Sequence, residues 1–137
     1  MTDFLQLEGK SFLILGVANR KSVAYHIART LEEAGARCVH VVRDDAVRAA
    51  TAKLLDGRDV HTCDVEKPED IDRLGDVLAE RGERFAGMVH SIAFADYSAG
   101  IKPFHETPRA AFLQAVDISC YSLTAVANAV KDLLEPD

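Results

Sequence analysis

Apolar residues along this chain alternate between short continuous runs and longer segments with helical spacing. Four runs, at residues 12–17, 37–42, 60–63 and 87–92, have the length and composition of buried strands. Helices are predicted at residues 22–34, 46–55 and 68–82, and a last one from 107 to about 134 with a break or bend near 117–119. Gly35 and Gly57 end helices, Asp44 or Asp45 caps one, and Pro68 suits a first helical turn.

This alternation of strand and helix predicts an α/β fold with a doubly wound, Rossmann-like parallel sheet, of which these four strands form the N-terminal half. Ligands of such sheets bind beyond the carboxyl ends of the strands. The candidate positions are therefore the residues that follow each strand: the turn at Gly16, then Arg43 with its neighbours, then Asp64 and Val65, and finally residues 91–95.

Composition narrows the class of protein. The 137 residues are 48% hydrophobic and 28% charged, which suits one compact domain and argues against disorder. The net charge of -6, without a long basic run, argues against a nucleic-acid partner. The three cysteines form no C-x-x-C pair, which favours reduced and mostly buried thiols. The five histidines lack metal-ligand spacing, so no metal site is expected.

Two further features bear on location. No apolar stretch in the sequence approaches the roughly 18 residues of a membrane span. The N-terminus lacks the positive flank of a signal peptide. We therefore expect a cytoplasmic protein with no membrane partner.

The segment from Gly16 to Ala24 follows the first strand and opens the first helix. Pyrophosphate binding needs backbone N–H groups at a helix N-terminus with little side chain in the way. Only Gly16 remains of the glycines that usually crowd such a turn, so spacing alone leaves open that Gly16 merely ends a strand. With its surroundings, the turn favours a dinucleotide-binding site.

The stretch Gly-Val-Ala-Asn-x-x-Ser-Val-Ala resembles the divergent nucleotide loop of bacterial enoyl-acyl carrier protein reductases, of the short-chain dehydrogenase/reductase superfamily. Other segments are similar to that family in order and spacing, and together they cover essentially the whole chain: residues 7–10, 33–36, 63–65, 89–95 and 117–122. Ordinary short-chain dehydrogenases carry an active-site Asn where this sequence has Asp117. An Asp at this position resembles the pattern of the enoyl reductase branch of the superfamily.

The resemblance implies roles for individual residues. Five would hold the pyrophosphate and neighbouring ribose: Gly16, Val17, Ala18, Ser22 and Val23. Asp64 and Val65 would face the adenine, although Asp64 as a helix-capping carboxylate and Ser91 as a turn hydroxyl are open alternatives. Ser91, Ile92 and Ala93 would line the path to the nicotinamide ribose, and Phe94 and Ala95 would edge the acyl pocket.

The cofactor form depends on the end of the second strand. An acidic residue there hydrogen-bonds the adenosine ribose of NAD, whereas an Arg accommodates the 2′-phosphate of NADP. Arg43 points to NADP, but Asp44 and Asp45 would repel that phosphate. We expect NADH, with NADPH as the alternative.

The family reduces the trans-2 double bond of an acyl group carried on acyl carrier protein, using a Tyr with a Lys seven positions later. Neither Tyr25, Tyr97 nor Tyr121 has a Lys at that offset, where Glu32, Phe104 and Asn128 stand. The sequence therefore predicts a single incomplete NAD(P)-binding domain over residues 1–137, without catalytic residues of its own. The complete family forms tetramers, and we expect the isolated chain to be aggregation-prone or oligomeric, with an exposed strand edge.

Three other interpretations stay open. A short, non-catalytic dinucleotide-binding module or degenerate homologue would bind the cofactor without turnover. A phospho-receiver domain has a similar length and fold, but Gly16 and its neighbours stand where its acidic pair should be. Another short-chain reductase acting on a ketone or sugar is opposed by Asp117.

Overall fold

The computed structural model describes residues 4–136 and contains a four-stranded parallel sheet. Its strands are β1 (Ser11–Leu15), β2 (Arg37–Val42), β3 (Asp59–Thr62) and β4 (Gly87–His90), in the order β3-β2-β1-β4. The strand order reverses between β1 and β4, so the sheet has the switch point typical of doubly wound folds. The Rossmann-like fold class predicted from the sequence is confirmed.

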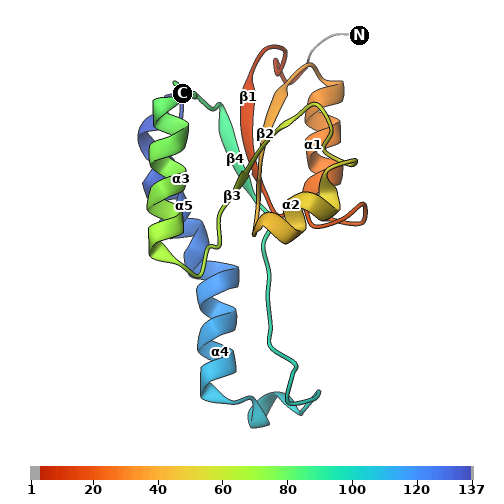
Figure 1. Cartoon of the computed structure of the whole chain (residues 1–137), viewed down its shortest axis with the longest axis vertical. Coiled ribbons are helices and arrows are strands. Elements are labelled where there is room, and N and C mark those ends of the chain that lie inside the picture. The colour runs from red at the N-terminus through yellow and green to blue at the C-terminus, as the bar shows by residue number, and fades with distance from the viewer. Residues whose placement is uncertain (1–3, 137) are drawn as a thin grey trace.

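Helices cover both faces of this sheet, as Figure 1 shows. On one face lie α1 (Val23–Glu33) and α2 (Asp45–Thr51), and on the other lie α3 (Pro68–Glu80) and α5 (Ser122–Val130). Gly75 of α3 allows a close approach to α5, because a Cβ at that position would lie 2.8 Å from the carbonyl oxygen of Ala129. The packing of α5 against α3 therefore depends on a small residue in α3.

The alternation of side chains along each strand divides the core in two. Leu13 and Leu15 of β1 are fully buried in the cluster that faces α3 and α5. Ile14, between them, is fully buried in the cluster that faces α1. Because both faces are apolar, β1 reads as a continuous hydrophobic run, which is typical of a central parallel strand.

The predicted helix from residue 107 is divided as expected near residue 117. It consists of α4 (Arg109–Val116), a π-helical turn (Asp117–Tyr121), α5 and a 3-10 turn (Lys131–Leu133). In the π turn, the N–H of Ser122 donates to the carbonyl of Asp117, five residues earlier, as well as to that of Cys120. Figure 1 shows α4 extending away from the sheet, beside the long connection that follows β4 and contains a 3-10 turn (Phe104–Glu106).

Element ends differ from the prediction where a local contact intervenes. β1 ends at Leu15 because Gly16 adopts φ +120°, and β4 ends at His90 because the chain leaves the sheet after the N–H of Ser91 donates to Leu15. α2 ends at Thr51 and continues in turns up to Gly57. β2 has the predicted bounds.

The edge of β4 is partly covered at its start. Phe85 forms a parallel bridge with Leu134, in which its N–H donates to Leu133 at 2.9 Å and its carbonyl accepts from Glu135 at 2.8 Å. Backbone groups of residues 133–135 thus begin to pair beside β4, next to the strand edge that the sequence predicts to be exposed.

The expectation that no stretch reaches the length of a membrane span is corrected for one helix. By length and composition alone, the helical stretch Arg109–Leu133 is long and apolar enough to cross a membrane, with a mean hydropathy of 1.3 in its most apolar window. Uncharged polar residues such as Gln114 and Asn128 interrupt the apolar runs in the sequence, so the runs taken singly are short. The helical segments from Arg109 to Leu133 nevertheless follow one another without a gap, and together they reach this length. Val126 and Val130, in its second half, are fully buried against the sheet and α3.

Candidate functional site

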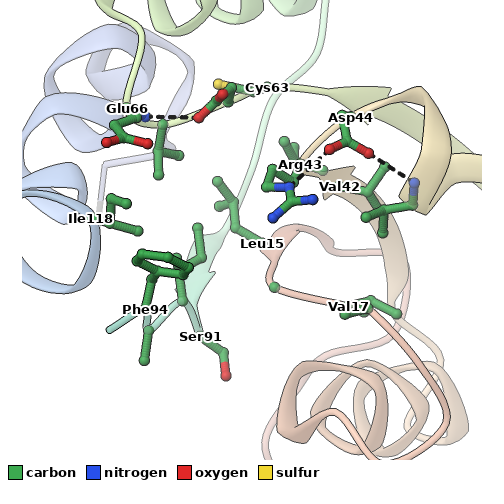
Figure 2. A pocket seen from close by; sticks show the side chains of 18 residues that line it. Leu15, Val17, Val42, Arg43, Asp44, Cys63, Glu66, Ser91, Phe94 and Ile118 are labelled. Carbon is green, nitrogen blue, oxygen red and sulfur yellow. Dashed lines mark hydrogen bonds and ion pairs between the residues drawn. The ribbon is translucent and has the colours of Figure 1, made fainter. Parts of the chain in front are cut away.

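A cavity of about 610 Å³ lies at the carboxyl ends of the strands, where a doubly wound sheet binds its ligand. Figure 2 shows Ile118 and Phe94 on one side of it and Arg43 and Asp44 on the other, with Leu15 between them. Ten of the predicted site residues line this cavity: Gly16, Val17, Ala18, Arg43, Asp64, Val65, Ser91, Ile92, Ala93 and Phe94.

The floor of the cavity is formed where the Gly16 turn meets the end of β4. A Cβ at residue 16 would lie 2.0 Å from the carbonyl oxygen of Ser91, and the φ of +120° is one that other residues rarely adopt. Glycine is therefore required here for two independent reasons. The backbones of β1 and β4 meet at the switch point without side chains between them.

The hydroxyl of Ser22 holds the Gly16 turn in place through hydrogen bonds to its backbone. It accepts hydrogen bonds from the N–H groups of Ala18 at 3.0 Å and Asn19 at 3.1 Å, while the Asn19 side chain accepts from Lys21 at 2.8 Å. These bonds hold a glycine-poor turn in place before α1, whose first N–H groups have no carbonyl partner within the helix. The arrangement leaves a helix N-terminus close to the turn, as anion binding requires.

Three predicted site residues do not line the cavity. Ser22 lies beneath the turn that it holds, and Ala95 follows Phe94 out of the cavity into an exposed segment. Val23 is 65% exposed and faces a shallow apolar groove on the outside of α1, lined also by His26, Ile27, Thr30 and Leu31. Their roles toward a cofactor stay predictions.

Arg43 and Asp44 form an ion pair at the end of β2. The Nε of Arg43 donates to Asp44 at 2.8 Å, and the other carboxylate oxygen accepts from the N–H of Val47 at 2.9 Å, which caps α2. The Val47 bond, and after it the Arg43 bond, lowers the pKa of Asp44. The rim of the cavity therefore carries a carboxylate that stays ionised at neutral pH, held in one orientation by the helix that it caps.

Asp64 and Glu66 form the wall that follows β3. The N–H of Glu66 donates to the Asp64 carboxylate at 3.1 Å, an Asx-turn contact, and the N–H of Asp64 donates to Asp70 at 3.0 Å. Asp64 does not cap α3, because the capping position belongs to Lys67. Gln114 of α4 donates to Glu66 at 2.8 Å and so ties α4 to this wall.

The opposite wall follows β4 and comprises residues 91–94. The N–H of Phe94 donates to the hydroxyl of Ser119 at 2.9 Å, and that hydroxyl is 3.2 Å from the Phe94 carbonyl, to which it donates. The neighbouring Ile118 reaches the cavity from the π turn. A distant helical segment thus completes this wall.

Asp44, next to Arg43 at the predicted strand end, also lines the cavity. Several other lining residues were not among the predicted site residues: Leu15, Val41, Val42, Val47, Cys63, Glu66 and Ile118. Most of them flank strand ends, so the same strand-end rule could have included them. Ile118 follows no strand, and only the tertiary fold brings it to the cavity. Burial raises the pKa of Cys63 to about 12, so this lining thiol stays protonated at neutral pH.

Comparison with known proteins places these features in a family. Residues 16–137 match the family described as Enoyl-(Acyl carrier protein) reductase. The chain is 36% identical over 135 residues to the NADPH-type enoyl-[acyl-carrier-protein] reductase FabI of Staphylococcus aureus, covering 95% of this chain and 53% of that protein. The chain thus spans about half the length of the curated relatives it matches.

Solved structures agree with this match. The NADH-type enoyl-[acyl-carrier-protein] reductase of Aquifex aeolicus superposes with a TM-score of 0.88 at 36% identity, covering 94% of this chain and 52% of that one. The Bacillus cereus enoyl-acyl carrier protein reductase, in complex with NADP+ and an indole naphthyridinone, superposes with a TM-score of 0.87 at 34% identity, covering 93% and 52%. By sequence and by fold, this chain belongs to the enoyl-acyl carrier protein reductase family of the short-chain dehydrogenase/reductase superfamily.

Proposed function

We propose that this chain is the cofactor-binding part of an NADH-dependent enoyl-acyl carrier protein reductase, an enzyme of fatty acid synthesis. The observation that carries the proposal is the close contact of Gly16 with Ser91 beneath a cavity of about 610 Å³. A dinucleotide crosses a doubly wound sheet at such a switch point, beyond the carboxyl ends of the strands.

Different residues of the cavity would hold different parts of the cofactor. The Gly16 turn, with Val17, Ala18 and the N-terminus of α1 at Ser22 and Val23, would hold the pyrophosphate. Asp64 and Val65 would receive the adenine, with the Asp64 carboxylate accepting from the exocyclic amine. Ser91, Ile92 and Ala93 would line the nicotinamide ribose, and Phe94 and Ala95 would edge the acyl pocket.

The choice of NADH rests on Asp44. Its carboxylate is fixed at the rim by Val47 and Arg43, in the position where an acidic side chain receives the adenosine ribose hydroxyls. A 2′-phosphate would meet this negative charge. NADPH is the alternative, because Arg43 lines the cavity, where an Arg can accommodate a 2′-phosphate, and the S. aureus relative is of the NADPH type.

The bound nicotinamide would supply a hydride to the β-carbon of a trans-2-enoyl group carried on acyl carrier protein. This chain's own residues bind and orient the cofactor. The family's Tyr and Lys pair, which stabilises the enolate oxygen, is not within these 137 residues, so we expect cofactor binding without turnover. The complete protein would be a cytoplasmic tetramer with neither a membrane nor a nucleic-acid partner.

A short, non-catalytic dinucleotide-binding module is the second candidate. It is favoured by the same missing pair, since none of the three tyrosines has a Lys seven positions later. Both candidates predict NADH binding. They differ in whether the encoding gene continues through another strand to a Tyr and Lys pair.

The test is an NADH titration of this chain, followed by fluorescence or calorimetry, with Gly16→Val as the matched variant. We expect saturable binding by the parent chain, loss of binding in the variant, and no NADH oxidation when a trans-2-enoyl thioester is added. Failure of the parent chain to bind NADH while folded would refute the proposal. Oxidation of NADH by the parent chain would refute the expected lack of turnover.

A further inference from the structure

The π turn lies against the loop that follows β4, and this contact has a specific chemistry. Within residues 4–136, the hydrogen bonds that join residues 92–102 to another element are both made by the hydroxyl of Ser119. That hydroxyl accepts from the N–H of Phe94 and donates to its carbonyl, so it satisfies both backbone groups of one residue. Residues 92–103 have no regular secondary structure of their own.

A second pair of contacts fixes the π turn relative to β4. Since the N–H of Ser122 is directed to Asp117 and Cys120, the Ile118 carbonyl accepts instead from the Ser122 hydroxyl at 2.7 Å. The same hydroxyl is 2.7 Å from Nε2 of His90, at the end of β4. With its proton donated to Ile118, the hydroxyl accepts from His90, which makes His90 a donor at Nε2. Ser122 is 1% exposed, so its hydroxyl makes these contacts shielded from solvent.

The two junctions differ in what they hold. The Ser122 contact anchors the π turn to β4, whose position the sheet already determines. The Ser119 contact fixes the backbone of Phe94 relative to the π turn, in a loop that forms no β-ladder hydrogen bonds. The carbonyl of an irregular loop residue is satisfied either by water or by a partner of this kind.

We propose that Ser119 is a positioning residue, whose hydroxyl holds the loop after β4 in the conformation that binds the nicotinamide end of the dinucleotide. The proposal rests on the proposed function, since it assigns that end of the cavity to the nicotinamide. Loss of the hydroxyl would leave the loop in the binding conformation for a smaller fraction of the time, and the apparent Kd rises by the factor by which that fraction falls.

The site of the effect distinguishes positioning from general stability. Within residues 4–136, the hydroxyl of Ser119 makes no hydrogen bond to Asp44, Asp64 or the Gly16 turn, so the adenosine end of the cavity should not respond to its loss. NADH spans both ends of the cavity, whereas ADP occupies only the adenosine and phosphate end. A positioning role therefore predicts weaker NADH binding with unchanged ADP binding.

The experiment compares this chain with Ser119→Ala, Ser119→Thr and Thr124→Ala. Thr124 is exposed in the following helix and has no hydrogen bond to the loop, so its variant controls for loss of a hydroxyl. Two hydrogen bonds are lost in Ser119→Ala, and we expect about a tenfold rise in the Kd for NADH. The Kd for ADP should be unchanged, Ser119→Thr should restore NADH binding, and Thr124→Ala should match the parent.

Amide hydrogen exchange at Phe94, measured by NMR in the absence of ligand, tests the contact itself. We expect faster exchange in Ser119→Ala and parent-like exchange in Thr124→Ala. Unchanged exchange at Phe94, unchanged NADH binding, or an equal rise in the Kd values for NADH and ADP would each overturn the proposal. Failure of the parent chain to bind NADH would instead overturn the proposed function on which it rests.

Discussion

Gly16 and Ser91 approach so closely that a single added carbon at residue 16 would lie 2.0 Å from the Ser91 carbonyl oxygen. The N–H of Ser91 in turn donates to the carbonyl of Leu15 at 3.0 Å, the last bond between β1 and β4. The sheet therefore remains paired up to the residue at which the turn begins. The floor of the cavity is backbone, which leaves room for a cofactor to lie across the switch point.

Gly16→Ala is expected to destabilise the chain and weaken NADH binding together. The positive φ alone costs about 1 kcal/mol, and displacement of the Ser91 backbone should raise the total loss of unfolding free energy to about 2–4 kcal/mol. Chemical denaturation measures the loss.

Gly57→Ala is the matched control for that substitution. Gly57 also has a positive φ, of +75°, but a Cβ there meets nothing within 4 Å. Its cost should be limited to backbone strain of about 1 kcal/mol, with NADH binding unaffected. Equal losses in the two variants would show that the contact with Ser91 does not matter.

The sequence predicted the strands and the turn because each depends on neighbours in the chain. β2 is a run of β-favouring residues ended by charges, and the capping of α2 by Asp44 is a contact between residues three apart. The bend near residue 117 was expected, but its π geometry was not. Ser119 and Phe94 are 25 residues apart, and no local pattern shows that one hydroxyl satisfies both backbone groups of the other.

Ser22 illustrates a role that the resemblance could not specify. The resemblance implies that Ser22 holds the pyrophosphate, and this role stays a prediction. In the structure its hydroxyl accepts from Ala18 and Asn19 within the turn, a contact that the resemblance did not specify. Whether a residue contacts a ligand directly or shapes the loop that does so depends on the direction of one side chain. Spacing along the sequence carries no information about that direction.

His40 should make the stability of the chain fall as the pH drops below about 6.5. It is fully buried in β2, where neither ring nitrogen has a hydrogen-bond partner among the described residues 4–136, and burial lowers its pKa to about 4, against a smaller opposing effect of Glu32. The unfolded chain binds the proton between about pH 6.5 and 4 and the folded chain does not, which costs up to about 3 kcal/mol of stability across that window.

Replacing His40 by Leu should remove this part of the pH dependence. Urea denaturation at a series of pH values measures it, and His105→Leu is the control because His105 is highly exposed. An unchanged slope between about pH 6.5 and 4.5 in His40→Leu would contradict the assignment of this window to His40.

Glu83 should contribute stability that is present at neutral pH and lost in acid. Its side chain is 8% exposed and accepts two bonds from Arg37, at 2.9 and 3.0 Å, which lower its pKa. The contribution is therefore complete above the unfolded pKa of about 4.3 and declines as the pH falls toward the lower folded pKa. Because Arg37 is half-exposed, we expect Glu83→Gln to cost only about 1–2 kcal/mol at neutral pH.

The matched control for Glu83 is Glu33→Gln. Glu33 pairs with Arg29 on the exposed face of α1, where both side chains are more than half exposed, so its loss should be within about 0.5 kcal/mol. Denaturation of both variants at neutral pH and at about pH 3.5 distinguishes their losses of unfolding free energy. A Glu83→Gln loss that persists undiminished in acid would show that charge is not its cause.

Asp44→Asn should shift cofactor preference toward NADPH without disturbing the fold. Asn is as good a helix N-cap as Asp, so the bond from Val47 is kept while the negative charge at the cavity rim is removed. A 2′-phosphate placed near this rim would no longer be repelled, and Arg43 would be released from its partner. We expect the ratio of the Kd values for NADPH and NADH to fall about tenfold.

Asp45→Asn, in the first turn of α2 but outside the residues that line the cavity, should leave the ratio unchanged. If Asp44→Asn leaves the ratio as it is in the parent chain, the carboxylate does not select the cofactor, and the preference must come from elsewhere in the cavity.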